Sequence, residues 1–283
     1  MVKLLEQDIR THEVLAWKGL HLLHGPPSSC SAKVRLFLRL KGIEWHSHPV
    51  GPGETLSPWY LGINPRGLVP ALVDDGDVHI ESNDIIMHLE SKFPEPALVP
   101  LNGAASMAEL LRHEDELHLD LRMLTFRFII PELAARPPEM LDAYRRLGSG
   151  TVGGKPDPAK LEQIGFYEKH RAGISDDDVR HSITKFRHAF DQHEEALGRT
   201  PFLLGDELTV LDIAWFIYVG RLIAAGYPFA RAHPNVARWY GELLVRQEFA
   251  EEHAVASLDP EIYRTLRARD AAEGRTLELL GGF

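Results

Sequence analysis

The chain has 283 residues, of which 44% are hydrophobic and 25% charged, which is the composition of an ordinary globular protein. Its net charge of -10 argues against nucleic acids and anionic membranes as partners, because no run of lysines and arginines offsets it. Its apolar stretches are shorter than the roughly 20 residues of a transmembrane helix. Cys30 is the only cysteine, which excludes an intramolecular disulfide and a thiolate zinc site and favours the reducing cytoplasm.

The first third of the chain alternates short strand and helix patterns. Residues 1–17 mix charged and apolar positions and are interpreted as a short, partly mobile N-terminal extension. The following patterns have the βαβ-ββα order of thioredoxin-like domains, so an α/β domain of that kind is expected over 18–94. The predicted strands cover 20–24, 43–49, 68–73 and 78–80, and the predicted helices cover 28–42 and 82–93.

The rest of the chain carries helical patterns. Three prolines and a glycine within 94–104 predict a linker over 95–104, and an all-α helical-bundle C-terminal domain is expected over 105–283. Its long helical patterns cover 107–130, 179–197, 209–225 and 235–246, before a polar helical tail that runs to residue 280. The region 131–178 is rich in proline and glycine, so we expect a long, loop-rich connection there.

A run of hydroxyl and thiol side chains opens the first predicted helix. Ser28, Ser29, Cys30 and Ser31 follow a turn at Gly25 that ends the first strand. The backbone N–H groups and the dipole at a helix N-terminus favour an anion such as a thiolate. The pKa of a thiol, about 8.5 in water, falls at such a position. Plain N-capping by serine beside one buried cysteine explains the same spacing equally well.

Two further motifs follow in the chain. Val69-Pro70 lies at the head of a strand, where a cis bond would turn the Val69 backbone groups towards an extended peptide ligand. An ordinary edge-strand proline is the alternative.

Glu81-Ser82 precedes the next helix, where a serine hydroxyl and backbone N–H groups suit a carboxylate and the acid suits an ammonium group. Ser82 also fits a simple N-cap.

The three motifs, in this order, resemble the glutathione transferase superfamily. The resemblance spans 18–93 and continues through 202–214, where Thr209 and Asp212 form a structural capping box. The run 28–35 is similar to the zeta class, whose matching motif places a serine against the glutathione sulfur. It is also similar to reductive dehalogenases of the superfamily, in which a cysteine at the position of Cys30 attacks the glutathionyl adduct. The segment 154–178 resembles that of β-aryl etherases.

The resemblance implies glutathione as co-substrate and a set of site residues. The implied catalytic groups are Ser28, Ser29 and Cys30, and the implied glutathione-binding residues are Ser31, Arg66, Leu68, Val69, Pro70, Glu81 and Ser82. Many family members carry a polar residue before the valine-proline pair, to bind the glycine carboxylate of glutathione. Leu68 stands there in this chain, so Arg66 or His79 is expected to replace it.

The implied function is a glutathione transferase that activates the thiol for attack on a small hydrophobic or aromatic electrophile, by conjugation or by aryl ether cleavage. The resemblance also implies a cytoplasmic homodimer with a role in detoxification. Two alternatives stay open: a thiol oxidoreductase or reductive dehalogenase that uses Cys30, and a non-catalytic interaction module. No metal site is expected, because His113 and His118 would lie about 140° apart around a helix.

Overall fold

The computed structural model describes residues 2–51, 53–100, 103–257 and 259–283. Within them the chain forms two compact units. A thioredoxin-like α/β domain makes up most of unit 1, and unit 2 is helical, which confirms the expected fold class. Unit 1 comprises residues 1–96 and 136–171, and unit 2 comprises residues 97–135 and 172–283.

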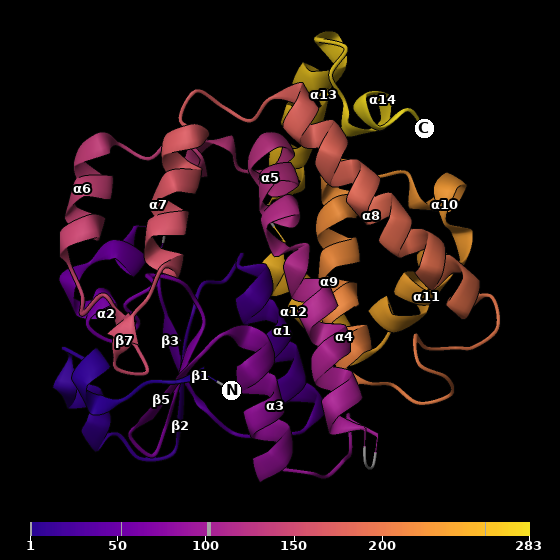
Figure 1. The fold of residues 1–283 in the computed structure, drawn as a ribbon. Coiled ribbons are helices and arrows are strands. Elements are labelled where there is room, and N and C mark those ends of the chain that lie inside the picture. Colours follow the sequence, from indigo (N-terminus) through magenta and orange to yellow (C-terminus); the bar gives the residue numbers. More distant parts are fainter. Residues whose placement is uncertain (1, 52, 101–102, 258) are drawn as a thin grey trace. The chain divides into compact units, whose positions relative to one another are not determined.

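A five-stranded mixed sheet in the order β1-β5-β4-β2-β3 forms the centre of unit 1 (Figure 1). β2 pairs parallel with β3 and antiparallel with β4, and β5 pairs antiparallel with both β4 and β1. The strands are β1 Val2–Lys3, β2 Leu20–His24, β3 His46–Pro49, β4 Ala71–Asp74 and β5 Asp77–Ile80. The helices are the 3-10 helices η1 Glu6–Asp8, η2 His12–Ala16 and η3 Glu54–Leu56, and α1 Ser29–Leu40, α2 Pro58–Leu61 and α3 Ser82–Lys92. α1 and α3 pack against each other.

The first residues of the chain belong to this domain. β1 adds an edge strand beside β5, and Ile9 and Val14 are buried in the core with residues of the central strands. Burial of these apolar side chains holds the segment against the sheet, in contrast to the mobile extension expected over 1–17. A two-residue strand and two 3-10 turns have no hydrophobic periodicity from which the sequence could predict them.

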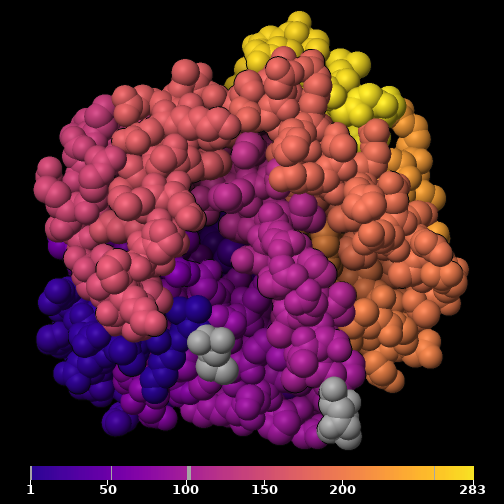
Figure 2. All heavy atoms as spheres, in the orientation of Figure 1, coloured from indigo at the N-terminus to yellow at the C-terminus, as the bar shows by residue number. Residues whose placement is uncertain are grey.

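The segment 136–171, called the insert below, also belongs to unit 1. The sequence placed it in the C-terminal domain as part of a loop-rich connection. The structure gives it two helices and a hairpin: α6 Pro138–Arg146, β6 Thr151–Val152, β7 Lys155–Pro156 and α7 Ala159–Lys169. The buried Asp8 accepts hydrogen bonds from the Thr151 hydroxyl (2.7 Å) and the Gly154 N–H (3.0 Å). Figure 2 shows the insert, in pink, against the indigo N-terminal residues.

Unit 2 is organised around one buried helix. Its α-helices are α4 Ala104–Glu116, α5 His118–Phe128, α8 Asp176–Leu197, α9 Val210–Ala225, α10 Phe229–Ala232, α11 Pro234–Leu244, α12 Gln247–Ala256, α13 Pro260–Ala272 and α14 Leu277–Gly281. The apolar α9 packs against α4, α5 and α11. The pattern predicted as one helix over 107–130 is interrupted at Leu117.

The boundary between the units, after residue 96, falls inside the predicted linker 95–104, of which residues 101–102 lie outside the described part. None of the helices in the described ranges has the length and apolar character needed to cross a membrane.

Asp212 fixes the start of α9. Its carboxylate is fully buried and accepts hydrogen bonds from the Thr209 N–H (2.9 Å) and hydroxyl (2.9 Å). The bond from the Thr209 N–H, together with the Asp212 N–H that faces the Thr209 side chain, forms the capping box expected from the sequence. The same carboxylate accepts from the Leu203 N–H at 3.0 Å and from the Trp239 indole at 3.2 Å. Four donors therefore depend on one side chain.

Replacing Asp212 by alanine is expected to lower the free energy of unfolding by roughly 3 kcal/mol, because it leaves these buried donors without an acceptor. Urea denaturation followed by circular dichroism measures the change. The matched control is Asp206→Ala at an exposed position nearby, which should cost less than about 0.5 kcal/mol. An equal loss in both variants would contradict the assigned role of Asp212.

Candidate active site

The turn between β2 and α1 brings the predicted hydroxyl groups to a helix N-terminus. Ser28 is the N-cap residue, and its hydroxyl oxygen accepts from the Ser31 N–H at 3.2 Å. Ser31 is fully buried, and its own hydroxyl accepts from the Gly25 N–H at 3.2 Å. Ser31 therefore braces the turn from within, whereas the half-buried Ser28 caps the helix and keeps its hydroxyl proton for another acceptor.

Ser29 and Cys30 form the first turn of α1. Both are half-buried, and Cys30 is not in a disulfide. Neither the hydroxyl nor the N–H of Ser29 has a hydrogen-bond partner within the described ranges. The helix thus begins with a hydroxyl and an amide that can donate to an anion.

A buried arginine supports this turn from below. Arg35 is 2% exposed, and its guanidinium donates to the backbone oxygens of Gly25 (3.1 Å) and Pro26 (2.9 Å). It also donates to Nδ1 of His24 at 3.0 Å. Burying a cation costs free energy unless its N–H groups have acceptors. The N–H groups of Arg35 find these acceptors in the turn, and the same bonds hold the carbonyls of the turn in place.

The side chain of His24, which accepts from Arg35, is a neutral imidazole. Burial, together with the charge of Arg35, lowers its pKa to about 4. Because Nδ1 accepts from Arg35, the ring proton lies on Nε2 and is donated to the Ser47 hydroxyl at 2.9 Å.

The Val69-Pro70 motif lies next to the α1 turn. The peptide bond is cis, as the sequence led us to expect. A methyl group added to Gly25 would lie 3.2 Å from Val69 Cγ2 and 3.5 Å from Ser28 Cβ, so the two motifs are neighbours. The Val69 N–H and C=O make no hydrogen bond to any residue that the structure describes. The carbonyl of Leu68, in contrast, is held by two side chains, the Tyr60 hydroxyl at 2.6 Å and the Asn64 amide at 2.7 Å.

Glu81 and Ser82 lie at the start of α3. Ser82 is the first helical residue rather than the N-cap, and Glu81 precedes the helix with φ 69°. A positive φ is uncommon for a residue with a side chain, and such conformations concentrate at binding sites. Lys33, on α1, donates to the Asn83 side chain on α3 at 3.1 Å. The starts of the two helices are thereby connected.

Arg66 lies between two carboxylates. Its Nη1 donates to Glu81 at 2.5 Å, and its Nε and Nη2 form a two-pronged pair with Asp157 at 2.7 and 3.0 Å. Asp157 comes from the insert. Burial alone would lower the pKa of Arg66, but the two carboxylates raise it above the ordinary value. The guanidinium therefore stays charged and fixes one oxygen of Glu81, which leaves the other oxygen to a ligand.

Two residues were expected to supply the polar group that is missing at Leu68. Arg66 contacts another predicted site residue, Glu81, whereas His79 contacts none of them. The His79 ring is buried and stacks on His88 with centroids 4.0 Å apart. Burial, with the charge of His88, lowers the pKa of His79 to about 4. His79 thus packs inside the domain, whereas Arg66 contacts Glu81 directly.

Sequence reasoning missed the residues that support the motifs. Arg35 had a detectable signal, since it lies four residues after Ser31 and so on the same helix face. Asp157 had none, because it is 91 residues from its partner Arg66. Within the described ranges, no three His, Cys, Asp or Glu residues are grouped so that they could hold a metal ion.

Two family models match parts of the chain. Residues 27–92 match the family model "Glutathione S-transferase, N-terminal domain", and residues 175–242 match "Glutathione S-transferase, C-terminal domain". The insert lies between the two matches.

Three similar proteins differ in how much of this chain they match and at what sequence identity. A zeta class glutathione S-transferase of Euphorbia esula is 49% identical over 75 residues, which are 26% of this chain and 33% of the relative, so the match spans about a third of that protein. Glutathione S-transferase 3 of Zea mays is 27% identical over 84% of this chain and 95% of the relative. The crystal structure of the β-etherase LigF from Sphingobium sp. strain SYK-6 superposes with a TM-score of 0.68 at 25% identity, covering 83% of this chain and 98% of that one.

Stability is expected to fall as the pH is lowered from 6.5 towards 4. His24 has a folded pKa of about 4 against 6.5 for an ordinary histidine, so in this window the unfolded chain binds more protons than the folded one. His24→Gln keeps an acceptor for Arg35 but cannot be protonated, and thermal unfolding measured across the window should show a shallower loss. His113→Gln, at an exposed position, should leave the slope unchanged. A wild-type slope in the His24 variant would refute the assignment.

Proposed function

Since this chain belongs to the glutathione transferase superfamily, we propose that it binds reduced glutathione in unit 1 and uses the thiolate to attack a small apolar electrophile. The observation that carries the proposal is the meeting of three motifs that lie far apart in the sequence. Ser28, Val69 and Glu81 belong to adjoining turns, each with polar groups left for a ligand.

Glutathione fits these groups as an extended peptide. Its backbone pairs with the N–H and C=O of Val69 in the manner of an added strand. The ammonium group of the γ-glutamyl end binds the second oxygen of Glu81, and its carboxylate binds the Ser82 hydroxyl and the N–H groups at the start of α3. Pro70 contacts the ligand from the side of the sheet. Leu68 makes no side-chain contact with it and contributes only a backbone whose carbonyl is fixed by Tyr60.

The sulfur then lies at the start of α1. The hydroxyl of Ser28 or Ser29 donates to it, and the N–H groups of the first turn favour its anionic form, which lowers the pKa of the thiol. The thiol proton leaves to water. The thiolate forms a C–S bond with the electrophilic carbon, and the leaving group departs with the electron pair of the bond that breaks.

Aryl ether cleavage is the second candidate reaction. It is favoured by the similarity to the β-etherase LigF, which extends over 98% of that chain. In this reaction the thiolate attacks the ether carbon, the C–O bond breaks, and a phenolate leaves and takes a proton from water. A chromogenic α-aryloxy ketone tested beside 1-chloro-2,4-dinitrobenzene separates ether cleavage from general conjugation.

Other features of the proposal follow from family membership. We expect a cytoplasmic homodimer with a role in detoxification. The alternatives remain a Cys30-dependent oxidoreductase or reductive dehalogenase and a non-catalytic module. A protein that does not bind glutathione in calorimetric titration would favour the last of these.

Single substitutions at Ser28, Ser29 and Cys30 identify the group that activates the sulfur. Loss of the activating hydroxyl by substitution to alanine should reduce kcat by roughly 100-fold while the Kd for glutathione changes by less than about threefold, because the contact matters mainly for the thiolate. Cys30→Ala is expected to retain turnover. If Cys30→Ala alone abolishes turnover and still binds glutathione, the thiol mechanism replaces the proposed one.

Asp157→Asn tests whether the insert positions the binding site. Removing the charge should free Arg66 to rotate and loosen Glu81, which weakens glutathione binding by roughly fivefold to tenfold in calorimetric titration. Asp142→Asn is the matched control, since Asp142 forms an exposed ion pair with Arg145 in the same insert. Equal affinities in the two variants would show that the insert has no part in binding.

A further inference from the structure

The loop between α2 and β4 carries two of the residues proposed to bind glutathione, Arg66 and Val69. Its residues form turns rather than a helix or a strand, so the course of its backbone depends on the side chains that contact it. Asn64 accepts from the Arg66 N–H at 3.0 Å, and Asn64 and Tyr60 both donate to the Leu68 carbonyl. The two ends of this short stretch are thus held from within the thioredoxin-like domain.

The insert holds the same loop from the other side. Tyr144, on α6, is 1% exposed, and its hydroxyl donates to the backbone carbonyl of Arg66. Its ring packs with Leu61 of α2 and Ile164 of α7 in a small hydrophobic cluster, and Figure 1 shows these three helices as neighbours. The insert therefore contacts Arg66 twice, at the backbone through Tyr144 and at the side chain through Asp157.

Gly67 leaves the space that the Tyr144 ring occupies. Its backbone has φ 62°, a conformation that favours glycine. A methyl group added to Gly67 would lie 3.1 Å from Cε2 of Tyr144 and 3.0 Å from Cδ2 of Leu56, which is closer than ordinary contact. Because residue 67 has no side chain, the ring approaches the loop closely enough for its hydroxyl to reach the preceding carbonyl.

A lysine of the insert keeps the Tyr144 ring in place. The ammonium nitrogen of Lys160 lies 5.2 Å from the centroid of the ring, and Lys160 also donates to the carbonyl of Leu147 at the end of α6. Lys160 is buried, and burial lowers its pKa. A ring packed between a cation and a hydrophobic cluster has few other rotamers, so the Tyr144 hydroxyl keeps a fixed direction.

We propose that Tyr144 is a positioning residue for glutathione binding and acts through the backbone of Arg66. By fixing the Arg66 carbonyl, its hydroxyl sets the course of the chain towards Val69, whose N–H and C=O pair with the glutathione backbone in the proposed complex. The same contact holds the Arg66 guanidinium beside Glu81. This role rests on the function proposed above, and it assigns to the insert the shape of the binding loop as well as one of its charges.

Tyr144→Phe separates positioning from simple packing, because it keeps the ring and removes only the hydroxyl. In calorimetric titration of the whole chain, we expect the Kd for glutathione to rise by roughly fivefold. The kcat with 1-chloro-2,4-dinitrobenzene at saturating glutathione should change by less than about twofold, since Tyr144 acts on the loop and not on the start of α1. A residue that only fills the hydrophobic cluster would leave both constants unchanged when its hydroxyl is removed.

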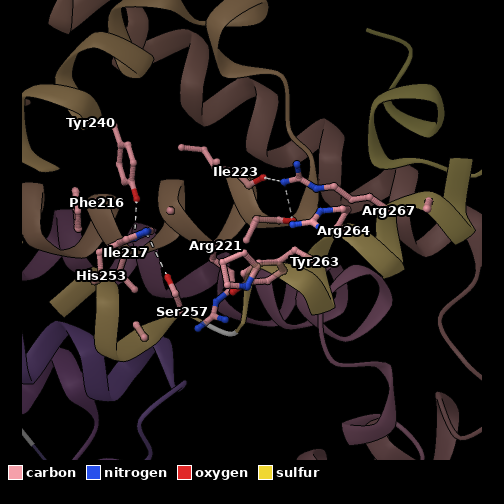
Figure 3. A pocket seen from close by; sticks show the side chains of 15 residues that line it. Phe216, Ile217, Arg221, Ile223, Tyr240, His253, Ser257, Tyr263, Arg264 and Arg267 are labelled. Carbon is pink, nitrogen blue, oxygen red and sulfur yellow. Dashed lines mark hydrogen bonds between the residues drawn. The ribbon is translucent and has the colours of Figure 1, made fainter. Parts of the chain in front are cut away.

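Tyr240→Phe is the matched control. Tyr240 is also buried, and its hydroxyl lies 3.1 Å from Nδ1 of His253 beside a pocket of about 770 Å3 in unit 2, which Figure 3 shows from close by. None of the described residues that line this pocket belongs to the proposed glutathione site. The control variant should therefore bind glutathione with the Kd of the wild type.

A double variant shows whether Tyr144 acts through Arg66. Tyr144 and Asp157 hold the same residue, so their contributions to binding are not independent. The variant that combines Tyr144→Phe with Asp157→Asn should bind glutathione no more than about twofold more weakly than the weaker of the two single variants. A Kd that rises by the product of the two single effects would show that Tyr144 does not act through Arg66.

Amide hydrogen exchange without ligand distinguishes a failure of this role from a failure of the proposed function. The N–H groups of Arg66 and Gly67 donate to the side chain and the carbonyl of Asn64, at 3.0 and 2.9 Å. Both should exchange about tenfold faster in Tyr144→Phe than in the wild type. A wild type that does not bind glutathione would overturn the proposed function and this role with it. A wild type that binds, beside a Tyr144→Phe variant with unchanged exchange and unchanged Kd, would overturn the role of Tyr144 alone.

Discussion

The site in unit 1 depends on one buried cation. Arg35 holds the carbonyls of Gly25 and Pro26, and its position is fixed by the neutral ring of His24. These contacts set the course of the chain between β2 and α1, so the first N–H groups of the helix keep a fixed direction. Because a guanidinium in the interior must have its donors satisfied, the turn cannot relax without exposing or orphaning a charge. The preorganised helix N-terminus that the proposed chemistry needs is a consequence of this constraint.

At the γ-glutamyl end of the proposed ligand, an arginine lies between two carboxylates. Arg66 joins Glu81 of the thioredoxin-like domain to Asp157 of the insert, and the same insert is tied to the first residues of the chain through Asp8. The insert therefore contributes to unit 1 twice, once to its packing and once to its charges. Neither family model covers the insert.

The sequence predicted the features that are local along the chain. The α1 cap at Ser28 and the Thr209–Asp212 box follow from side chains within a few residues of one another, and α9 follows from its apolar run. Long-range features could not be predicted in this way. The pairing of Asp157 with Arg66, and the burial of Ile9 and Val14 beside the sheet, depend on segments that meet only in the folded chain. The prolines and glycines of the insert indicated loops, whereas packing on unit 1 stabilises two helices and a hairpin there.

A pH titration of the bound sulfur shows whether the positive end of α1 stabilises the thiolate of glutathione. The ultraviolet absorbance of the thiolate, recorded as the difference between the complex and its separate components, reports the ionisation of glutathione on the protein. We predict that bound glutathione ionises at least one pH unit below the free thiol, whose pKa is about 8.5. A bound thiol that titrates at the same pH as the free tripeptide would show that the helix end does not stabilise the thiolate.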